Sequence, residues 1–143
     1  LVPYIEEGFS KSGGARSMCD FDLAPFVTCI VGDDLDSCRM PVKGMLSLYI
    51  GGMGARGKNF YTDYVKRLGY EEAALKIQDL YLDGKKTDAM AAVPDELVDS
   101  VSLVGSRDRI AARIQAWQDS PATTLLLGAQ QPEAIQLLAE LVL

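Results

Sequence analysis

The stretch Thr123-Thr124-Leu125-Leu126-Leu127-Gly128 decides the fold class of this 143-residue chain. It is short and largely apolar, and it lies between two segments whose apolar residues recur at helical spacing, Arg107–Gln118 and the segment that begins at Pro132. A short apolar strand between two one-sided helices must be covered on both faces, as in a parallel α/β sheet or barrel. The end of the chain therefore predicts a helix, a buried strand and a second helix.

One other stretch, Phe21 to Val31, is typical of a strand. Its second half is continuously apolar and rich in β-branched residues, as in strands that are buried on both faces. Pro25 is expected near the beginning of this strand, because proline cannot donate a hydrogen bond to a neighbouring strand. We thus expect two parallel strands, at about 21–31 and 123–128. Two strands cannot close such a sheet, so residues 1–143 are expected to form a single domain that is part of a larger sheet.

The segment after the first strand is expected to be helical. Asp33 or Asp34 can cap the next helix through its side-chain oxygen. That helix is expected from about Leu35 to Ile50, with a kink or break near Pro41. The following stretch, Gly51-Gly52-Met53-Gly54-Ala55-Arg56-Gly57-Lys58, is too rich in glycine for a helix and is expected to form a loop.

Residues 59–100 predict three or four short helices with no strand between them, because glycine and proline interrupt an otherwise helical pattern. The two strands are thus separated by about ninety residues, far more than an ordinary barrel connection. We interpret residues 51–100 or so as a mostly helical insertion on the scaffold. Insertions of this kind commonly contact substrates or close over a site.

The composition argues against several classes of function. The net charge is −6, with 20 acidic and 14 basic residues and no basic stripe, so no nucleic acid or acidic membrane surface is expected as a partner. The apolar runs are shorter than the ~20 residues of a membrane span, and no signal peptide is expected. The chain has no histidine, which removes histidine-based catalytic triads and zinc sites within it. Three cysteines without a CxxC spacing favour a reducing, cytoplasmic location.

The glycine-rich stretch 51–58 is the best local candidate for ligand binding. Its glycines let the backbone approach an anion, while Arg56 and Lys58 supply positive charge. It is not a P-loop, because Lys58 is followed by Asn59 instead of serine or threonine. A flexible connection with solvated charges is the alternative interpretation.

The acidic residues Asp33, Asp34 and Asp36 could suggest a metal site, but helix capping explains them with fewer assumptions. No metal ligand is therefore assigned.

Four segments carry a resemblance to a known family. They are Tyr49–Tyr61, Ile77–Leu82, Ala92–Asp99, and Ser102–Gly105 with the arginine-rich helix after it. These segments resemble the luciferase-like monooxygenase family, in its deazaflavin-dependent (coenzyme F420) branch. The resemblance covers nearly the whole chain, although none of the four segments is a catalytic signature.

The resemblance implies a fold. Members of the family are TIM (β/α)8 barrels, and the chain corresponds to their C-terminal portion, with residues 21–31 as the seventh strand and residues 123–128 as the eighth. It also implies an oxidoreductase that binds coenzyme F420, or alternatively FMN, at the barrel mouth and transfers a hydride to or from a small-molecule substrate. In the flavin-using members, which are monooxygenases, oxygen takes part.

The resemblance also limits which site residues can be assigned. The catalytic residues of the family come from the first six strands, so none is assigned here, and this portion alone is expected to be inactive. Gly32 and Gly128, beside the strand ends, are the candidate cofactor contacts. Arg56 or Lys58 is the candidate contact to an anionic tail or substrate.

Two other functions stay open at this point. The chain could be a non-catalytic α/β module that completes its sheet by pairing with another chain or with itself, because exposed strand edges recruit partners. It could also be a small anion-binding domain that uses Arg56 and Lys58. The oxidoreductase interpretation requires the remainder of the barrel as a partner of this chain. A homo-oligomer is also left open.

Overall fold

Three parallel strands form the sheet of this protein, in a computed structural model that describes residues 1–142. They are β1 (Phe26–Val31), β2 (Ser102–Gly105) and β3 (Leu126–Gly128). β1 is central and pairs in parallel with β2 on one side and with β3 on the other. The prediction of a parallel α/β fold is confirmed, and the two predicted strands are indeed neighbours. The prediction of only two strands is wrong.

The missed strand, β2, lies directly between two helices, α6 (Asp95–Val101) and α7 (Arg107–Gln118). All four of its residues are buried. No turn separates it from α6, so its apolar residues read as a continuation of the helical pattern. Only its pairing with β1 reveals it, since Gly32 at the end of β1 donates its N–H to the Gly105 carbonyl at 3.0 Å.

The strands β1 and β3 are shorter than expected, but their pairing continues irregularly beyond the regular strands. The N–H of Thr123 donates to the Leu23 carbonyl at 3.0 Å, and that of Leu126 donates to the Pro25 carbonyl at 2.9 Å. Pro25 stands directly before β1, where its missing N–H interrupts no strand pairing. The two stretches predicted as strands therefore run side by side over most of their length.

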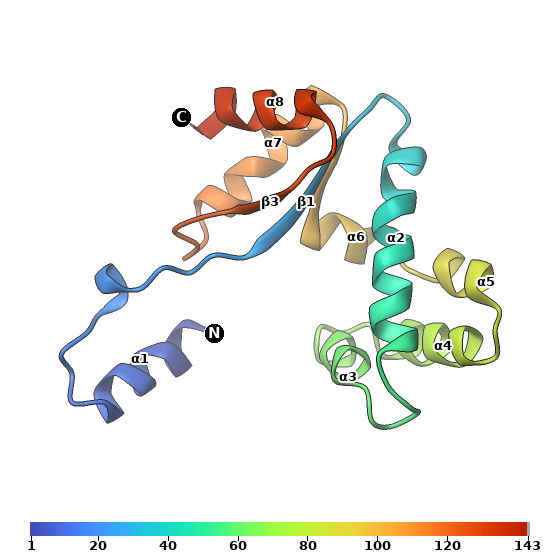
Figure 1. Ribbon diagram of the computed structural model, residues 1–143, viewed down its shortest axis with the longest axis horizontal. Helices are drawn as coiled ribbons and strands as arrows, with labels where there is room; N and C mark the ends of the chain where they lie inside the picture. The colour runs from blue at the N-terminus through green and yellow to red at the C-terminus, as the bar shows by residue number, and fades with distance from the viewer. Residues whose placement is uncertain (143) are drawn as a thin grey trace.

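One face of the sheet is fully covered. Val27 and Cys29 of β1 point toward α7 and α8 (Pro132–Val142) and form an apolar core with Leu103, Ile110 and other residues of those elements. Figure 1 shows α7 and α8 packed together on this side of β1. The helices that flank the final strand in sequence thus cover the same face of the sheet.

The other face is covered only in part. Ile30 and Val104 pack against α2 (Leu35–Gly52) and its neighbours. Further toward the start of the strands the sheet lies bare, and the side chains of Phe26 and Leu126 are 61% and 50% exposed. We call Phe26, Thr28, Leu126 and Gly128 the open face, because the parallel register places all four on the same side.

The expected insertion is built of short helices packed on α2. They are α3 (Phe60–Arg67), α4 (Glu71–Leu82), α5 (Lys86–Ala91) and α6, and no strand is found between residues 59 and 100. Asp34 caps α2, as predicted, and Asn59 caps α3 in the same way. α2 runs unbroken through Pro41, so the predicted break does not occur, because the helix is held on both sides of the proline: Arg39 before it bonds to α6, and Gly51 after it packs against Tyr81 of α4.

Gly51 and Gly52 lie in the last turn of α2, not in a loop as their sequence context predicted. α4 approaches α2 so closely here that a Cβ on Gly51 would lie 2.3 Å from the Cβ of Tyr81. The two glycines therefore permit close helix packing, and the loop is confined to the residues from Met53 onward.

Replacing Gly51 with alanine should lower the free energy of unfolding by about 1–3 kcal/mol, because the new methyl group must separate α2 from α4. Chemical denaturation of the two proteins would measure this difference. Gly57→Ala is a useful contrast: that glycine has open space around it and a φ of 71°, so its cost would come from backbone strain alone. A neutral Gly51→Ala variant would contradict the close packing described here.

The N-terminal helix α1 (Val2–Lys11) stands apart from the rest of the molecule. Figure 1 shows it joined to β1 by a long segment that contains one short helical turn, Met18–Asp20, and none of its residues is buried. The ring of Phe9 meets the ring of Phe21 edge-on, with centroids 5.7 Å apart. This one contact leaves the apolar side of the helix largely uncovered among the described residues. No helix within residues 1–142 is long and apolar enough to cross a membrane.

Candidate functional site

A cavity of about 510 Å³ lies where the carboxyl ends of β1 and β3 meet α2. β1 contributes Thr28 and Ile30, α2 contributes Pro41 and Met45, and the end of β3 with the segment after it contributes residues 127–131. No charged side chain of the described chain lines this cavity. Ligands of parallel α/β folds bind at this end of the strands, so the cavity is the candidate site. We call it the mouth cavity.

Gln131 fixes one rim of the mouth cavity. Its side-chain amide donates to the Val31 carbonyl at 3.0 Å and accepts from the Val31 N–H at 2.9 Å. The amide thereby takes the place of a further residue of β3 and holds the segment 129–131 against the end of β1. The sequence analysis missed this residue, because an uncharged glutamine after a strand carries no signal that distinguishes it from a surface residue.

The two glycines predicted at the strand ends lie in different surroundings. Gly128 lines the mouth cavity, and a Cβ there would come within 2.3 Å of the Phe26 ring. Gly32 faces β2, and a Cβ there would lie 2.8 Å from the Cys38 sulfur. Close packing within the chain thus accounts for both glycines, and their assignment to a cofactor stays a prediction.

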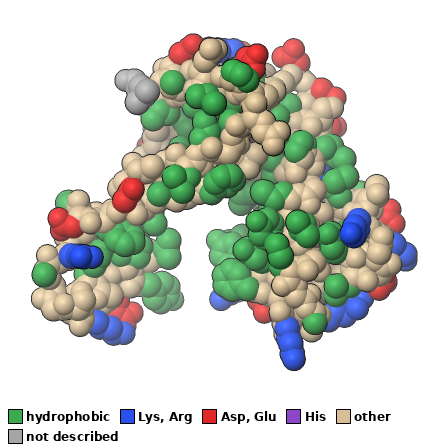
Figure 2. All heavy atoms as spheres, viewed as in Figure 1, with side chains coloured by type: hydrophobic (Ala, Val, Ile, Leu, Met, Phe, Trp, Pro, Cys, Tyr) green, Lys and Arg blue, Asp and Glu red, His purple; other side chains and the backbone are tan. Residues whose placement is uncertain are grey.

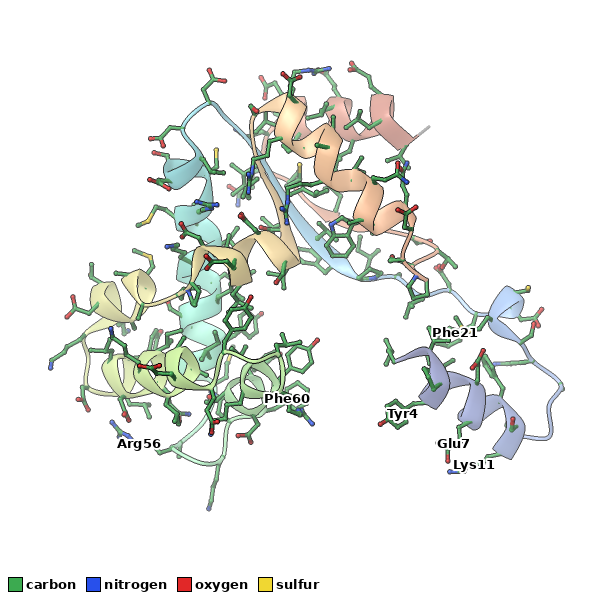
Figure 3. The ribbon with its side chains drawn as sticks, turned by 180° about the vertical axis from the view of Figure 1, so that it is seen from behind. Tyr4, Glu7, Lys11, Phe21, Arg56 and Phe60 are labelled. Atoms are coloured by element: carbon green, nitrogen blue, oxygen red, sulfur yellow. The ribbon has the colours of Figure 1, made fainter. Side chains whose placement is uncertain are left out.

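Arg56 and Lys58 lie at the opposite end of α2 from the strand ends. The 18 residues of this helix span ~27 Å, so the structure does not bring these two cations to the mouth cavity. Figure 3 shows Arg56 on the side of the molecule away from the sheet. Its Nε donates to Asp79 at 2.6 Å and one terminal nitrogen donates to Asp83 at 3.0 Å. Hydrogen bonds to Asp79, then to Asp83, raise the pKa of Arg56.

A cluster of ion pairs, which the sequence analysis also missed, joins α2 to α6 and α7 next to the site. The Arg39 side chain of α2 donates to Asp99 of α6 at 2.7 Å and to Asp95 at 2.9 Å. Arg109 of α7 donates to the same Asp99 oxygen at 2.7 Å. Lys43 completes the cluster with a 2.6 Å contact to Asp95. These pairs tie α2, α6 and α7 together around β2.

The cluster determines the protonation of its central carboxylate. Burial acts to raise the pKa of Asp99, but the hydrogen bonds from Arg39 and Arg109 outweigh it, so the pKa lies below its ordinary value. The pKa of Asp95 is also lowered, first by its hydrogen bond with Lys43. Both groups are therefore anionic at neutral pH. Asp95 and Asp99 form ion pairs that hold three helices together, and neither side chain lines the mouth cavity.

The mouth cavity itself offers little acid–base chemistry. Cys29 borders it, but its side chain packs on the other face of the sheet, where burial raises the pKa of this thiol to about 11, so it is protonated at neutral pH and is not an activated nucleophile. Within residues 1–142 no group of acidic or cysteine side chains could hold a metal ion. The side chain of Asp34 instead accepts from the backbone N–H groups of Asp36 and Ser37 as a helix cap.

The residues of the mouth cavity suit one part of a deazaflavin or flavin. An uncharged cavity with apolar walls and amide groups at its rim can accept the flat ring system of such a cofactor. It provides no cation for the anionic tail, and Arg56, the first candidate for that role, is already paired with two carboxylates. The described residues can therefore hold the ring of the cofactor. At this cavity they supply no positively charged partner for its anionic tail.

The chain is similar to known proteins of one family. A family model described as luciferase-like monooxygenase matches residues 1–124. A protein of Mycobacterium tuberculosis, named provisionally as a coenzyme F420-dependent oxidoreductase, is 33% identical over 97% of the chain. The structure of the coenzyme F420-dependent tetrahydromethanopterin reductase from Methanopyrus kandleri is similar over 99% of the chain, with a TM-score of 0.71 and 22% identity. The chain spans 40% of the length of each of these two relatives.

Proposed function

This chain belongs to the luciferase-like monooxygenase family, and we propose that it is the C-terminal part of a coenzyme F420-dependent oxidoreductase that transfers a hydride at the mouth of a barrel. The observation that carries the proposal is the relative named for coenzyme F420, which is 33% identical along nearly the whole chain. The uncharged cavity at the carboxyl ends of β1 and β3 supports it, because this is where a barrel enzyme binds its cofactor.

In this proposal the described residues bind and enclose the ring of the cofactor. When bound, coenzyme F420 supplies a hydride donor or acceptor. The backbone around Gly128 and the side chain of Gln131 form one edge of its site, and Pro41 and Met45 of α2 form the other. Their apolar surfaces exclude water from the ring. Contacts to the anionic tail and the catalytic groups are assigned to residues outside this chain, and FMN is the alternative cofactor.

The open face is the second element of the proposal. We infer that β1 and β3 are the last two strands of a (β/α)8 barrel and that the remaining strands cover Phe26 and Leu126, which are now exposed. The chain spans 40% of its relatives' length, which leaves ample sequence for those strands. β2 lies outside the simple sequential order of such a barrel, since it pairs with β1 on the side away from β3.

The open face also supports a second candidate function, a non-catalytic module that completes its sheet by pairing with another chain. Light scattering on the protein expressed from its complete reading frame separates the two: a monomer would argue against this candidate. The small anion-binding domain has weaker support, because Arg56 is occupied by Asp79 and Asp83. The cytoplasmic location expected from the cysteine count stays a prediction.

A titration of the protein from its complete reading frame with coenzyme F420 and with FMN tests the proposal. We expect micromolar or tighter binding of coenzyme F420 and at least roughly tenfold weaker binding of FMN, a difference of about 1.4 kcal/mol. A preference for FMN would mean that the protein is one of the flavin-using members of the family. If neither cofactor binds, the proposed function is wrong.

A further inference from the structure

A second cavity, of about 450 Å³, opens beside the mouth cavity between α2, α3 and α6. Its walls are aromatic: Tyr49 comes from α2, and Phe60, Tyr61 and Tyr64 come from α3. We call it the aromatic cleft. Figure 2 shows hydrophobic side chains gathered over α3 and the adjoining part of α2, and Figure 3 shows Phe60 pointing out from α3.

The aromatic rings are arranged in an ordered cluster. The rings of Phe60 and Tyr64 are nearly parallel, with an angle of 7° and centroids 6.2 Å apart. Tyr61 meets both Phe60 and Tyr49 edge-on, with centroids 5.4 Å and 4.7 Å away. Phe60 is nevertheless 66% exposed. A surface cluster of four rings on a pair of helices is typical of a binding site, because it leaves a large apolar area in contact with water.

The aromatic cleft lies directly beside the mouth cavity. Phe26, Thr28 and Met45 line both of them, so these three side chains form a shared wall. Hydride transfer requires direct contact between substrate and cofactor, with the reacting atoms about 3–3.5 Å apart. A substrate held in the cleft would make this contact with the part that extends past the shared wall into the mouth cavity.

The chemistry of the lining selects the occupant. None of the side chains that line the cleft is charged. Arg67 lies beside its aromatic wall, with its guanidinium carbon 6.0 Å from the centroid of the Tyr64 ring. A charged ligand would lose its hydration in the cleft without gaining an ion pair. The tyrosine and threonine hydroxyls can still satisfy one or two polar groups of a neutral ligand.

We propose that the aromatic cleft binds the substrate of this oxidoreductase and that this substrate is an uncharged aromatic molecule. The volume of the cleft suits a fused two- or three-ring compound. The inference rests on the proposed function, because it places the substrate beside the proposed cofactor. The competing occupants are the remainder of the chain and a second copy, either of which would close the cleft to small molecules.

Two probes of equal ring size test the inference: 2-naphthol, which is uncharged at neutral pH, and 2-naphthoate, which carries a carboxylate. Equilibrium dialysis with the protein from its complete reading frame should show one molecule of 2-naphthol bound per chain and at least roughly tenfold weaker binding of 2-naphthoate. The Phe60→Ala variant should bind 2-naphthol about tenfold more weakly. Leu75→Ala is the matched control, because Leu75 is exposed on α4 and lies outside both cavities.

The inference is overturned if 2-naphthol does not bind, if 2-naphthoate binds equally well, or if Phe60→Ala changes the affinity no more than Leu75→Ala does. A titration with coenzyme F420 on the same samples separates this outcome from failure of the proposed function. Binding of coenzyme F420 without binding of 2-naphthol refutes the substrate assignment alone. Absence of coenzyme F420 binding refutes the proposed function, and the assignment of a substrate falls with it.

Discussion

The 143-residue chain on its own is expected to bind coenzyme F420 at least about a hundredfold more weakly than the protein expressed from its complete reading frame, a loss of ~2.7 kcal/mol. The reason is geometric. The mouth cavity has walls from β1, α2 and the segment after β3, while the open face beside it is exposed. Cofactor sites bury roughly 70–90% of the ligand surface, which these walls alone do not achieve.

The missing charge adds to this expected loss. No cation of the described chain lines the mouth cavity, so the anionic tail of the cofactor would stay in solvent. The comparison requires that the chain be folded, which circular dichroism and a cooperative thermal transition would establish. Micromolar binding of coenzyme F420 by the folded chain would contradict the prediction and would show that its site is complete.

The second large effect is expected from Asp99→Ala, which should lower the free energy of unfolding by about 2–3 kcal/mol. The side chain of Asp99 is 16% exposed and that of its partner Arg39 is 12% exposed, so removing the carboxylate leaves a guanidinium largely buried beside it. Arg109 also loses its acceptor on α6. The thermal midpoint should fall by roughly 4–10 °C, as measured by differential scanning calorimetry.

Asp79→Ala is the matched control for that variant. It also removes a carboxylate that accepts from an arginine, but both partners are more than half exposed, and we expect little change in the thermal midpoint. If Asp99→Ala is no more harmful than Asp79→Ala, the cluster around Arg39 does not hold α2, α6 and α7 together.

The same cluster predicts how stability depends on pH. The pKa values of Asp99 and Asp95 are lower in the folded protein than their ordinary values, so below about pH 4 the unfolded chain binds more protons than the folded one. The stabilisation is fully present above the ordinary pKa and is lost as the pH falls through the folded pKa. Asp99→Ala should therefore flatten the fall in stability below about pH 4, which denaturation at several pH values would measure.

Much of the fold could be predicted because its signals are local. The apolar run before Gly128, the β-branched run before Gly32 and the side-chain cap at Asp34 each lie within a few residues of the structure they specify. Their predictions are confirmed. The pairing of the two predicted strands was an expectation from the family resemblance, which made them the seventh and eighth strands, and the structure pairs them.

The features that were missed depend on partners far away in the sequence. β2 is four residues long and follows a helix without a turn, so only its pairing with β1 identifies it. Gly51 is required by Tyr81, which lies thirty residues later and belongs to another helix. Gln131 and Asp99 act through bonds to Val31 and Arg39. No periodicity or motif in a single sequence records such contacts.

The candidate site was the least predictable part for the same reason. The sequence drew attention to charge, at Arg56 and Lys58, whereas the cavities at the strand ends are uncharged and are formed by side chains from several elements. The aromatic residues of α3 read as the apolar stripe of a core helix. Their exposure became visible only when the helix was placed beside α2 and β1.

A crystal structure of the protein from its complete reading frame with coenzyme F420 bound tests the central claim most directly. The account predicts that β1 and β3 are neighbouring strands of a closed barrel, that its other strands cover Phe26 and Leu126, and that the cofactor ring lies against Gly128 and Gln131. A cofactor bound away from this cavity, or a sheet that leaves Phe26 and Leu126 in solvent, would contradict it.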